Sequence, residues 1–177
     1  MGEGTTDKRI IITGPESTGK SDLSVYLADR FKGKAIPEFA RTYISELNRD
    51  YTYSDIEIIA REQYETWKSH EKSSHLVFFD THLIITKIWF LWLYKKYPDW
   101  LDKAINETST CLCLLCNYDI PWRPDPLREN GGEAREKLFY LYKSELEKNK
   151  INYHIIKGVG EERFKYARKV VQEKFEL

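Results

Sequence analysis

Apolar residues gather in five short runs along this chain, each bounded by polar or turn-forming positions. Runs of this length, without strict alternation, are typical of strands buried on both faces of a parallel sheet. The pattern predicts strands at residues 9–13, 35–39, 75–80, 110–116 and 152–156.

Between these runs, apolar residues recur every three or four positions, which is the period of an amphipathic helix. Ser54 and Glu57 have the spacing of a capping box at the start of one such helix. The apolar stripe of that helix includes a polar residue, Gln63, which is either a hydrogen-bonded core amide or a ligand contact. The predicted helices are 20–31, a segment starting at 54, 83–96, 133–148 and 161–175. The helix 83–96 is apolar, and we expect it to form part of the core.

The alternation of strands and helices predicts an α/β fold, with a parallel sheet and helices on both of its faces. A chain of 177 residues fits one domain with its own core, which we place at residues 1–177. The carboxyl ends of the strands then lie along one edge of the sheet, where open α/β folds bind ligands.

Charge is balanced, because 28 Lys and Arg residues face 28 Asp and Glu residues. This balance argues against a nucleic acid as the main partner, since phosphate backbones select basic surfaces. The most apolar stretch, 88–94, is too short to cross a bilayer. The first eight residues are too short and polar for a signal peptide. We therefore expect a cytoplasmic protein with no membrane partner.

Three cysteines, Cys111, Cys113 and Cys116, lie within one predicted strand. They form either a metal or redox site or part of a buried strand. Alternation along a strand points Cys113 and Cys116 to opposite faces, and no further zinc ligand lies nearby. We favour the buried strand.

Residues 14–21 read GPESTGKS and directly follow the first apolar run. A strand, this loop and a helix together are typical of a P-loop, whose backbone N–H groups hold a polyphosphate. Lys20 is expected to reach the β- and γ-phosphates, and the Ser21 hydroxyl to hold Mg²⁺. The predicted ATP contacts in the loop are Gly14, Glu16, Ser17, Thr18, Gly19, Lys20 and Ser21.

Two acidic residues end predicted strands. Asp80 follows four apolar residues, and in a P-loop fold a carboxylate there meets Mg²⁺; the alternative is an N-cap for the next helix. Glu38 ends the second strand, where it either accepts the proton of a substrate hydroxyl or pairs with Arg41 to shape the turn.

The segment after the fourth strand is rich in proline and arginine. Prolines stiffen the backbone, and Arg123, Arg128 and Arg135 are expected to surround the triphosphate and clamp the transferring phosphoryl group. We therefore predict a lid at about 121–135; a solvated loop is the alternative. The loop 157–163 follows the last strand, and its glycines would allow close approach to the adenine, with Arg163 as a nucleotide contact. The predicted catalytic residues are Lys20, Glu38, Asp80, Arg123 and Arg128.

Four segments together resemble the ribosylnicotinamide kinase domain of NadR-type NAD-biosynthesis proteins, which are P-loop kinases. They read GPESTGKS at 14–21, PEFARTYI at 37–44, FFDTHLIITK at 78–87 and PWRPDPLREN at 121–130. The resemblance runs from about residue 8 to residue 175. It implies a five-stranded sheet of order 2-3-1-4-5. It also implies transfer of the γ-phosphate of ATP to the 5′-hydroxyl of nicotinamide riboside, which gives nicotinamide mononucleotide.

The resemblance also implies roles for single residues. Lys20 and Ser21 match the phosphate and Mg²⁺ residues of the family, and Asp80 matches the first acid of its Asp-Thr-Asp segment. Glu38 and Arg41 match the family's Glu and Arg after the second strand, and Trp122, Asp125 and Arg128 match its lid. The predicted contacts of the small nucleoside substrate are Glu38, Phe39, Arg41, Trp122 and Asp125.

Two positions depart from the family pattern. Pro37 stands where the family commonly has a tryptophan associated with the nicotinamide ring, and His82 replaces the second acid of Asp-Thr-Asp. Stacking on the ring could instead come from Phe39, Tyr43 or Trp122. Alternatives are therefore a kinase of another nucleoside or small alcohol, or an ATP-binding regulator without catalysis. With no further domain ahead of the kinase segments, we expect a stand-alone kinase.

Overall fold

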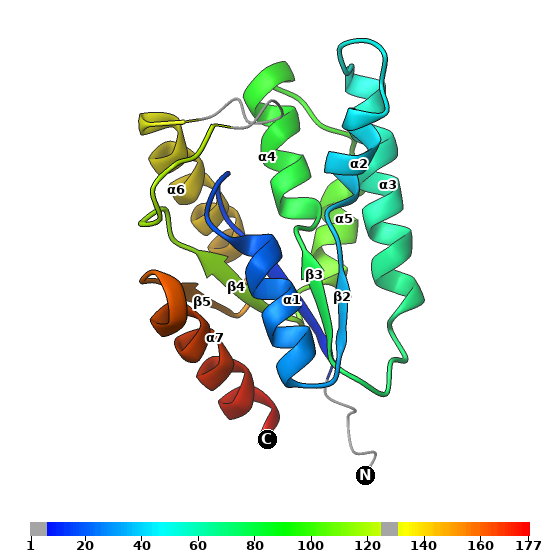
Figure 1. Cartoon of the computed structure of the whole chain (residues 1–177). Helices are drawn as coiled ribbons and strands as arrows, with labels where there is room; N and C mark the ends of the chain where they lie inside the picture. The colour runs from blue at the N-terminus through cyan, green and yellow to red at the C-terminus, as the bar shows by residue number, and fades with distance from the viewer. Residues whose placement is uncertain (1–6, 125–130) are drawn as a thin grey trace.

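The computed structural model describes residues 7–124 and 131–177. Five parallel strands form one sheet in the order β2-β3-β1-β4-β5, which confirms the expected topology (Figure 1). The strands are β1 Arg9–Thr13, β2 Lys34–Ile36, β3 Val77–Asp80, β4 Leu112–Cys116 and β5 Tyr153–Ile156.

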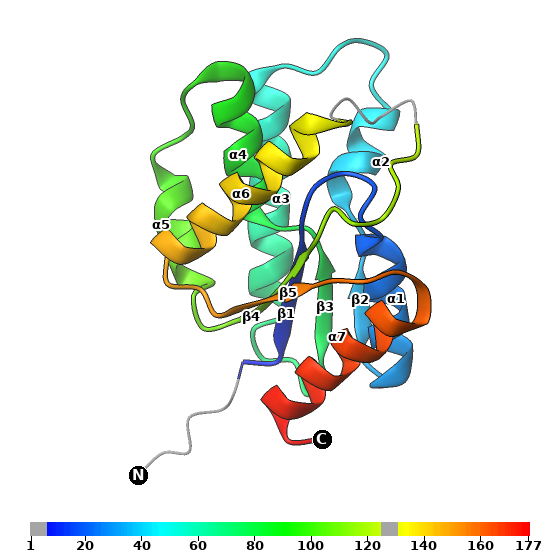
Figure 2. The same cartoon turned by 90° about the vertical axis from the view of Figure 1, so that its left-hand side faces the viewer.

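The sheet has helices on both faces (Figures 1 and 2). One apolar cluster joins side chains such as Ile11 and Phe79 to α3, α4, α5 and α6. A second cluster joins Ile10, Ile12 and Phe78 to α1 and α7. Adjacent side chains of β1 therefore pack into opposite clusters, because successive side chains of a strand point to opposite faces of the sheet. The helices are α1 Lys20–Arg30, α2 Phe39–Ser45, α3 Tyr53–Ser69, α4 Leu83–Tyr94, α5 Trp100–Glu107, α6 Glu133–Lys148 and α7 Gly160–Phe175.

The central strand β1 is buried along its whole length, and its register fixes the geometry of the site. Ile12 lies opposite Asp80 of β3, so β3 ends level with the last residues of β1. The loop that follows β1 therefore starts beside Asp80.

Two helices were not predicted. The second strand ends at Ile36 rather than Phe39, because Pro37 has no N–H to donate to the strand ladder; Phe39 instead begins α2. Helix α5 buries Leu101, Ala104 and Ile105, a helical spacing in a segment of only eight residues. Other predicted bounds differ from the observed ones by at most two residues.

The predicted capping box at Ser54 and Glu57 is wrong. The N-cap of α3 is Thr52, whose backbone N–H donates to Asp55 at 2.7 Å. Asp55 is the residue three positions after this cap, so it closes the box two positions earlier than expected.

The three cysteines form part of the core. All three are buried and unpaired, with Cys113 in the cluster of α3 to α6 and Cys116 in that of α1 and α7. Among the described residues, no three His, Cys, Asp or Glu side chains are grouped as a metal site. The buried-strand interpretation is confirmed.

Over the same described ranges, none of the helices has the length and apolar character needed to span a bilayer.

Candidate active site

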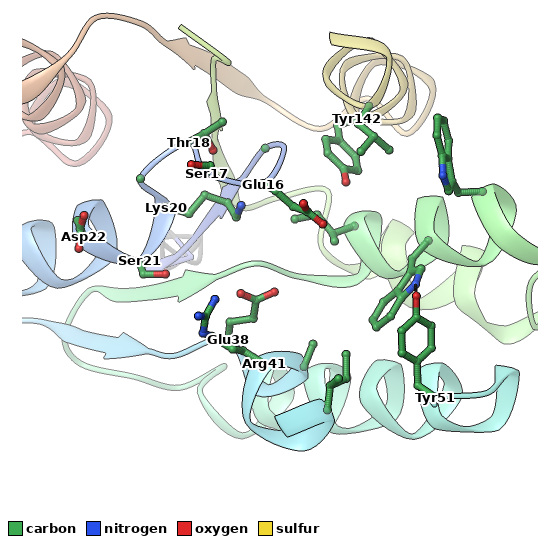
Figure 3. A pocket seen from close by; sticks show the side chains of 18 of the residues that line it. Glu16, Ser17, Thr18, Lys20, Ser21, Asp22, Glu38, Arg41, Tyr51 and Tyr142 are labelled. Carbon is green, nitrogen blue, oxygen red and sulfur yellow. Dashed lines mark hydrogen bonds between the residues drawn. The ribbon is translucent and has the colours of Figure 1, made fainter. Parts of the chain in front are cut away.

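A cavity of about 520 Å³ lies where the predicted P-loop meets Glu38 (Figure 3). Its walls come from the P-loop, the start of α1, α2, the connection 46–52, α4 and α6. Lys20, Ser21, Glu38 and Arg41 all line it, so residues predicted from separate segments meet in one space.

The P-loop wraps closely around its own backbone. Lys20 Nζ and Thr18 Oγ1 each donate a hydrogen bond to the Pro15 carbonyl at 2.8 Å. Gly14 has φ 141°, and a Cβ there would lie 2.6 Å from the Cys116 carbonyl oxygen. Only glycine fits this position, because the loop passes directly over the end of β4.

Asp80 lies beside the P-loop, and one of its carboxylate oxygens accepts a hydrogen bond from it. The Ser21 hydroxyl donates to Asp80 Oδ2, whereas the buried Oδ1 has no hydrogen-bond partner within residues 7–124 and 131–177. Burial raises the pKa of Asp80, against the opposing charge of Lys20 and the hydrogen bond from Ser21. An unsatisfied carboxylate oxygen next to a hydroxyl suits a hard cation such as Mg²⁺, which takes few protein oxygens besides phosphate and water.

Glu38 lies across the cavity from Lys20 (Figure 3). It is half-buried, and desolvation raises its pKa, opposed by the charge of Lys20 and reinforced by that of Asp80. The positive charge of Arg41 also lowers the pKa of Glu38, so the two residues of the expected pair are close enough to interact. A carboxylate with a raised pKa is suited to accepting a proton.

His82, which replaces an acid of the family pattern, does not line the main cavity. It lines a separate cavity of about 30 Å³ beside Asp80, together with Pro37 and Phe39. Its ring centroid lies 5.8 Å from that of Trp67, and burial, with the charge of Arg9, lowers its pKa to about 3. His82 is therefore a neutral, buried side chain.

Gln63 also borders this small cavity. It is buried and its side-chain oxygen accepts a hydrogen bond from Thr86 Oγ1, as expected of a core amide.

Two predicted substrate contacts lie away from the main cavity. Phe39, the first residue of α2, borders the small cavity instead. Trp122 packs toward Gly131, where an added Cβ would come within 3.1 Å of its ring. The turn of the chain after Pro37 and the approach of Gly131 account for these two positions.

The described part of the predicted lid contacts the P-loop through hydrogen bonds to Ser17. The Arg123 N–H donates to Ser17 Oγ at 3.0 Å. Arg135 is buried and donates to the carbonyls of Ser17 and Ile120. Arg135 thus joins the segment predicted as a lid to the P-loop, and it does not line the cavity as the sequence suggested. Two other predicted residues, Asp125 and Arg128, lie outside the described residues.

Arg163 is buried and holds the P-loop in place through hydrogen bonds. The side chain is 1% exposed, and its guanidinium donates to the carbonyls of Thr18, Asn117 and Gly158 and to the Asp119 carboxylate. These bonds tie the P-loop to the loops after β4 and β5. The geometry gives Arg163 a positioning role; direct contact with a nucleotide stays a prediction.

Aromatic residues at the opposite end of the cavity from the P-loop were missed as site residues. They are Tyr51, Trp89, Trp92 and Tyr142. The apolar segment 83–96 was predicted to be core, yet Trp89 and Trp92 are three residues apart and therefore share a helix face. Two tryptophans on one face of the helix that follows β3 were the available signal.

A P-loop after the first strand, a carboxylate ending β3 and the sheet order β2-β3-β1-β4-β5 together define the fold of a P-loop kinase. A family model described as "AAA domain" (AAA_28) matches residues 9–163. The chain belongs to this AAA domain family.

Curated relatives support the resemblance seen in the motifs. The chain is 28% identical over 174 residues to the trifunctional NAD biosynthesis/regulator protein NadR of Salmonella typhimurium, covering 94% of the chain and 42% of that protein. It is 29% identical over 153 residues to NadR of Escherichia coli, covering 82% of the chain and 37% of that protein. The chain thus spans less than half the length of these relatives.

Solved structures share the fold. A NadR structure in complex with NAD and AMP-PNP superposes with a TM-score of 0.76 at 23% identity, covering 97% of this chain and 50% of that one. A NadR complex with NR gives a TM-score of 0.75 at 23% identity, covering 96% and 51%. A deoxyadenosine kinase from M. mycoides gives 0.67 at 13% identity, covering 93% and 99%.

Proposed function

We propose that this protein is an ATP-dependent kinase that transfers the γ-phosphate of ATP to the 5′-hydroxyl of nicotinamide riboside, giving nicotinamide mononucleotide. The observation that carries the proposal is the shared cavity, in which Glu38 faces Lys20 of the P-loop. The identity of 28–29% with two NadR proteins supports the choice of acceptor.

The chain's own residues divide the work. The P-loop amides and Lys20 hold the β- and γ-phosphates. Glu38 orients the acceptor hydroxyl and takes its proton as the oxygen bonds to the γ-phosphorus and ADP leaves. The lid at about 121–135, with Arg123, excludes water that would otherwise hydrolyse ATP.

Ser21 and Asp80 are the residues that would hold Mg²⁺. The unsatisfied Asp80 Oδ1 and the adjacent Ser21 hydroxyl fit this ion. When bound, Mg²⁺ neutralises charge on the phosphate oxygens and helps to orient them.

Product analysis tests this proposal. Purified protein with ATP, Mg²⁺ and nicotinamide riboside should form nicotinamide mononucleotide and ADP in equal amounts. Lys20→Ala is the matched control and should abolish transfer without loss of folded protein. No mononucleotide above the level of the Lys20→Ala control would refute the assignment.

A second candidate keeps the reaction and changes the acceptor to another nucleoside or small alcohol. Pro37 and the buried, neutral His82 favour it, because both differ from the family pattern beside Asp80. ADP release measured across a panel of acceptors separates the two, since the true acceptor stimulates release most.

A further inference from the structure

The main cavity has two chemically different ends. Its lining includes Lys20, Ser21 and Glu38, and also four aromatic residues, Tyr51, Trp89, Trp92 and Tyr142, here called the aromatic end. Trp89 packs against Tyr51, and Trp92 lies one helical turn after Trp89 on α4. Figure 3 shows Tyr51 and Tyr142 on the side of the cavity away from Ser21. Since the phosphates occupy the P-loop, the aromatic end is left for the molecule that receives the phosphate.

The aromatic end is preorganised. The rings of Tyr51 and Trp89 meet edge to face at 4.9 Å and 71°, and Trp89 Nε1 donates to the Tyr51 hydroxyl at 3.4 Å. Tyr51 belongs to the connection 46–52, which Asp55 anchors through a salt bridge to Arg49 at 2.7 Å. Rigid aromatic walls bind a flat ring at low entropic cost.

Charge at this end favours a cation. Asp50 and Arg49 both line the cavity, and the charge of Arg49 is paired with Asp55, which lies outside the lining. Farther along the same space the acidic side chains of Glu16 and Glu38 lie with the basic side chains of Lys20 and Arg41, so the charge there is balanced. A positive ring between aromatic faces gains cation–π attraction as well as electrostatic attraction to Asp50.

We propose that the aromatic end is the subsite for the base of the acceptor, and that it selects a flat, positively charged heteroaromatic ring. The sugar of the acceptor then spans the cavity, so that its hydroxyl reaches Glu38. The inference rests on the proposed function in assuming a nucleoside acceptor, but it concerns which residues select the base.

Trp92→Leu tests the subsite, with Trp100→Leu as the matched control. Trp100 lies on α5 and does not line the cavity. Trp92→Leu should raise the KM for nicotinamide riboside about tenfold, while the KM for ATP stays within about twofold. Trp92→Phe keeps a stacking face and should recover most of the loss. Trp100→Leu should behave as wild type.

The charge preference has its own test. Wild-type protein should have a lower KM for nicotinamide riboside than for its uncharged reduced form. Asp50→Asn should narrow this ratio by about threefold to tenfold. An unchanged ratio would remove Asp50 from the selection of the base.

The outcomes distinguish this inference from the function on which it rests. If the wild type phosphorylates another nucleoside but not nicotinamide riboside, the proposed function fails, and the same variants test the subsite with that nucleoside. Equal KM values for the working acceptor in wild type and Trp92→Leu would overturn the subsite alone. Turnover with no nucleoside would overturn both.

Discussion

Two aspartates are almost equally buried, yet their surroundings shift their pKa values in opposite directions. Asp55 is 2% exposed and Asp80 is 4% exposed. Asp55 accepts hydrogen bonds from Arg49, from Tyr43 and from both the backbone and the hydroxyl of Thr52. Within the part of the chain that the structure describes, Asp80 accepts one from Ser21 and its other oxygen has no partner.

The pKa values follow from these partners. The hydrogen bonds from Arg49 and Thr52 hold the pKa of Asp55 well below its usual range, whereas burial raises that of Asp80. A buried carboxylate that accepts several hydrogen bonds stabilises the fold. A buried carboxylate oxygen without a donor lowers stability, and it is typical of a site that binds a ligand. Burial alone therefore does not separate a structural acid from a functional one; the count of donors does.

The largest effect is expected from Asp80→Asn. Removing the charge that would hold Mg²⁺ should lower kcat/KM by about 100- to 1000-fold. The thermal midpoint of the unligated protein should stay level or rise, because a poorly solvated charge is removed. Steady-state kinetics and a thermal melt on the same preparation check both parts. Wild-type kinetics in this variant would end the metal assignment.

Asp55→Asn should mainly change the stability of the fold. The loss of a carboxylate with several donors should lower the free energy of unfolding by about 2 kcal/mol, a modest figure because Arg49 can return to water. Urea denaturation followed by tryptophan fluorescence measures it. A stability equal to wild type would mean that the network around Asp55 adds nothing to the fold.

Glu38→Gln should lower kcat/KM by about 10- to 100-fold near neutral pH if Glu38 accepts the proton. Because its pKa is raised, the wild-type rate should fall on acidification at a pH above the usual glutamate value of 4.5. The variant should lose this acid limb. A small loss with the limb intact would reduce Glu38 to a group that orients the hydroxyl.

The smallest expected effect is on how the stability of the fold depends on pH. Raised pKa values at Asp80 and Glu38 mean that the folded protein binds protons more readily than the unfolded chain, so their contribution to stability grows as pH falls toward the raised values. The lowered pKa of Asp55 acts oppositely, and its contribution is lost only in stronger acid. Thermal melts from about pH 7 to pH 5 should therefore differ in slope between wild type and the Asp80→Asn, Glu38→Gln double variant. Parallel slopes would contradict the shifts.

Much of the donor side of the site could be predicted from the sequence. The strand order follows from local motifs on a parallel sheet, and so does the closeness of Lys20 to both Glu38 and Asp80, whose pKa values it lowers. These residues come directly after strands, and strand ends converge whatever the detailed packing.

The acceptor side could not be predicted in the same way. Trp89 and Trp92 look like core because their neighbours on α4 are apolar, and only the position of the connection 46–52 shows that they face a cavity. Arg163 and Arg135 look like ligand contacts because arginine suits phosphate, yet both donate to backbone carbonyls. Tertiary contacts that decide such roles leave no local pattern.

The hydrogen bond from Lys20 to the Pro15 carbonyl has a consequence for ligand selectivity. Without a ligand, Lys20 donates to a carbonyl of the P-loop itself. A phosphate that binds Lys20 therefore has to displace the Pro15 carbonyl. A single anion exchanges one bond for another and gains little. A nucleoside triphosphate gains in addition the contacts of its other phosphates along the loop amides. Competition within the loop therefore favours long polyphosphates over inorganic phosphate before any base or sugar is recognised.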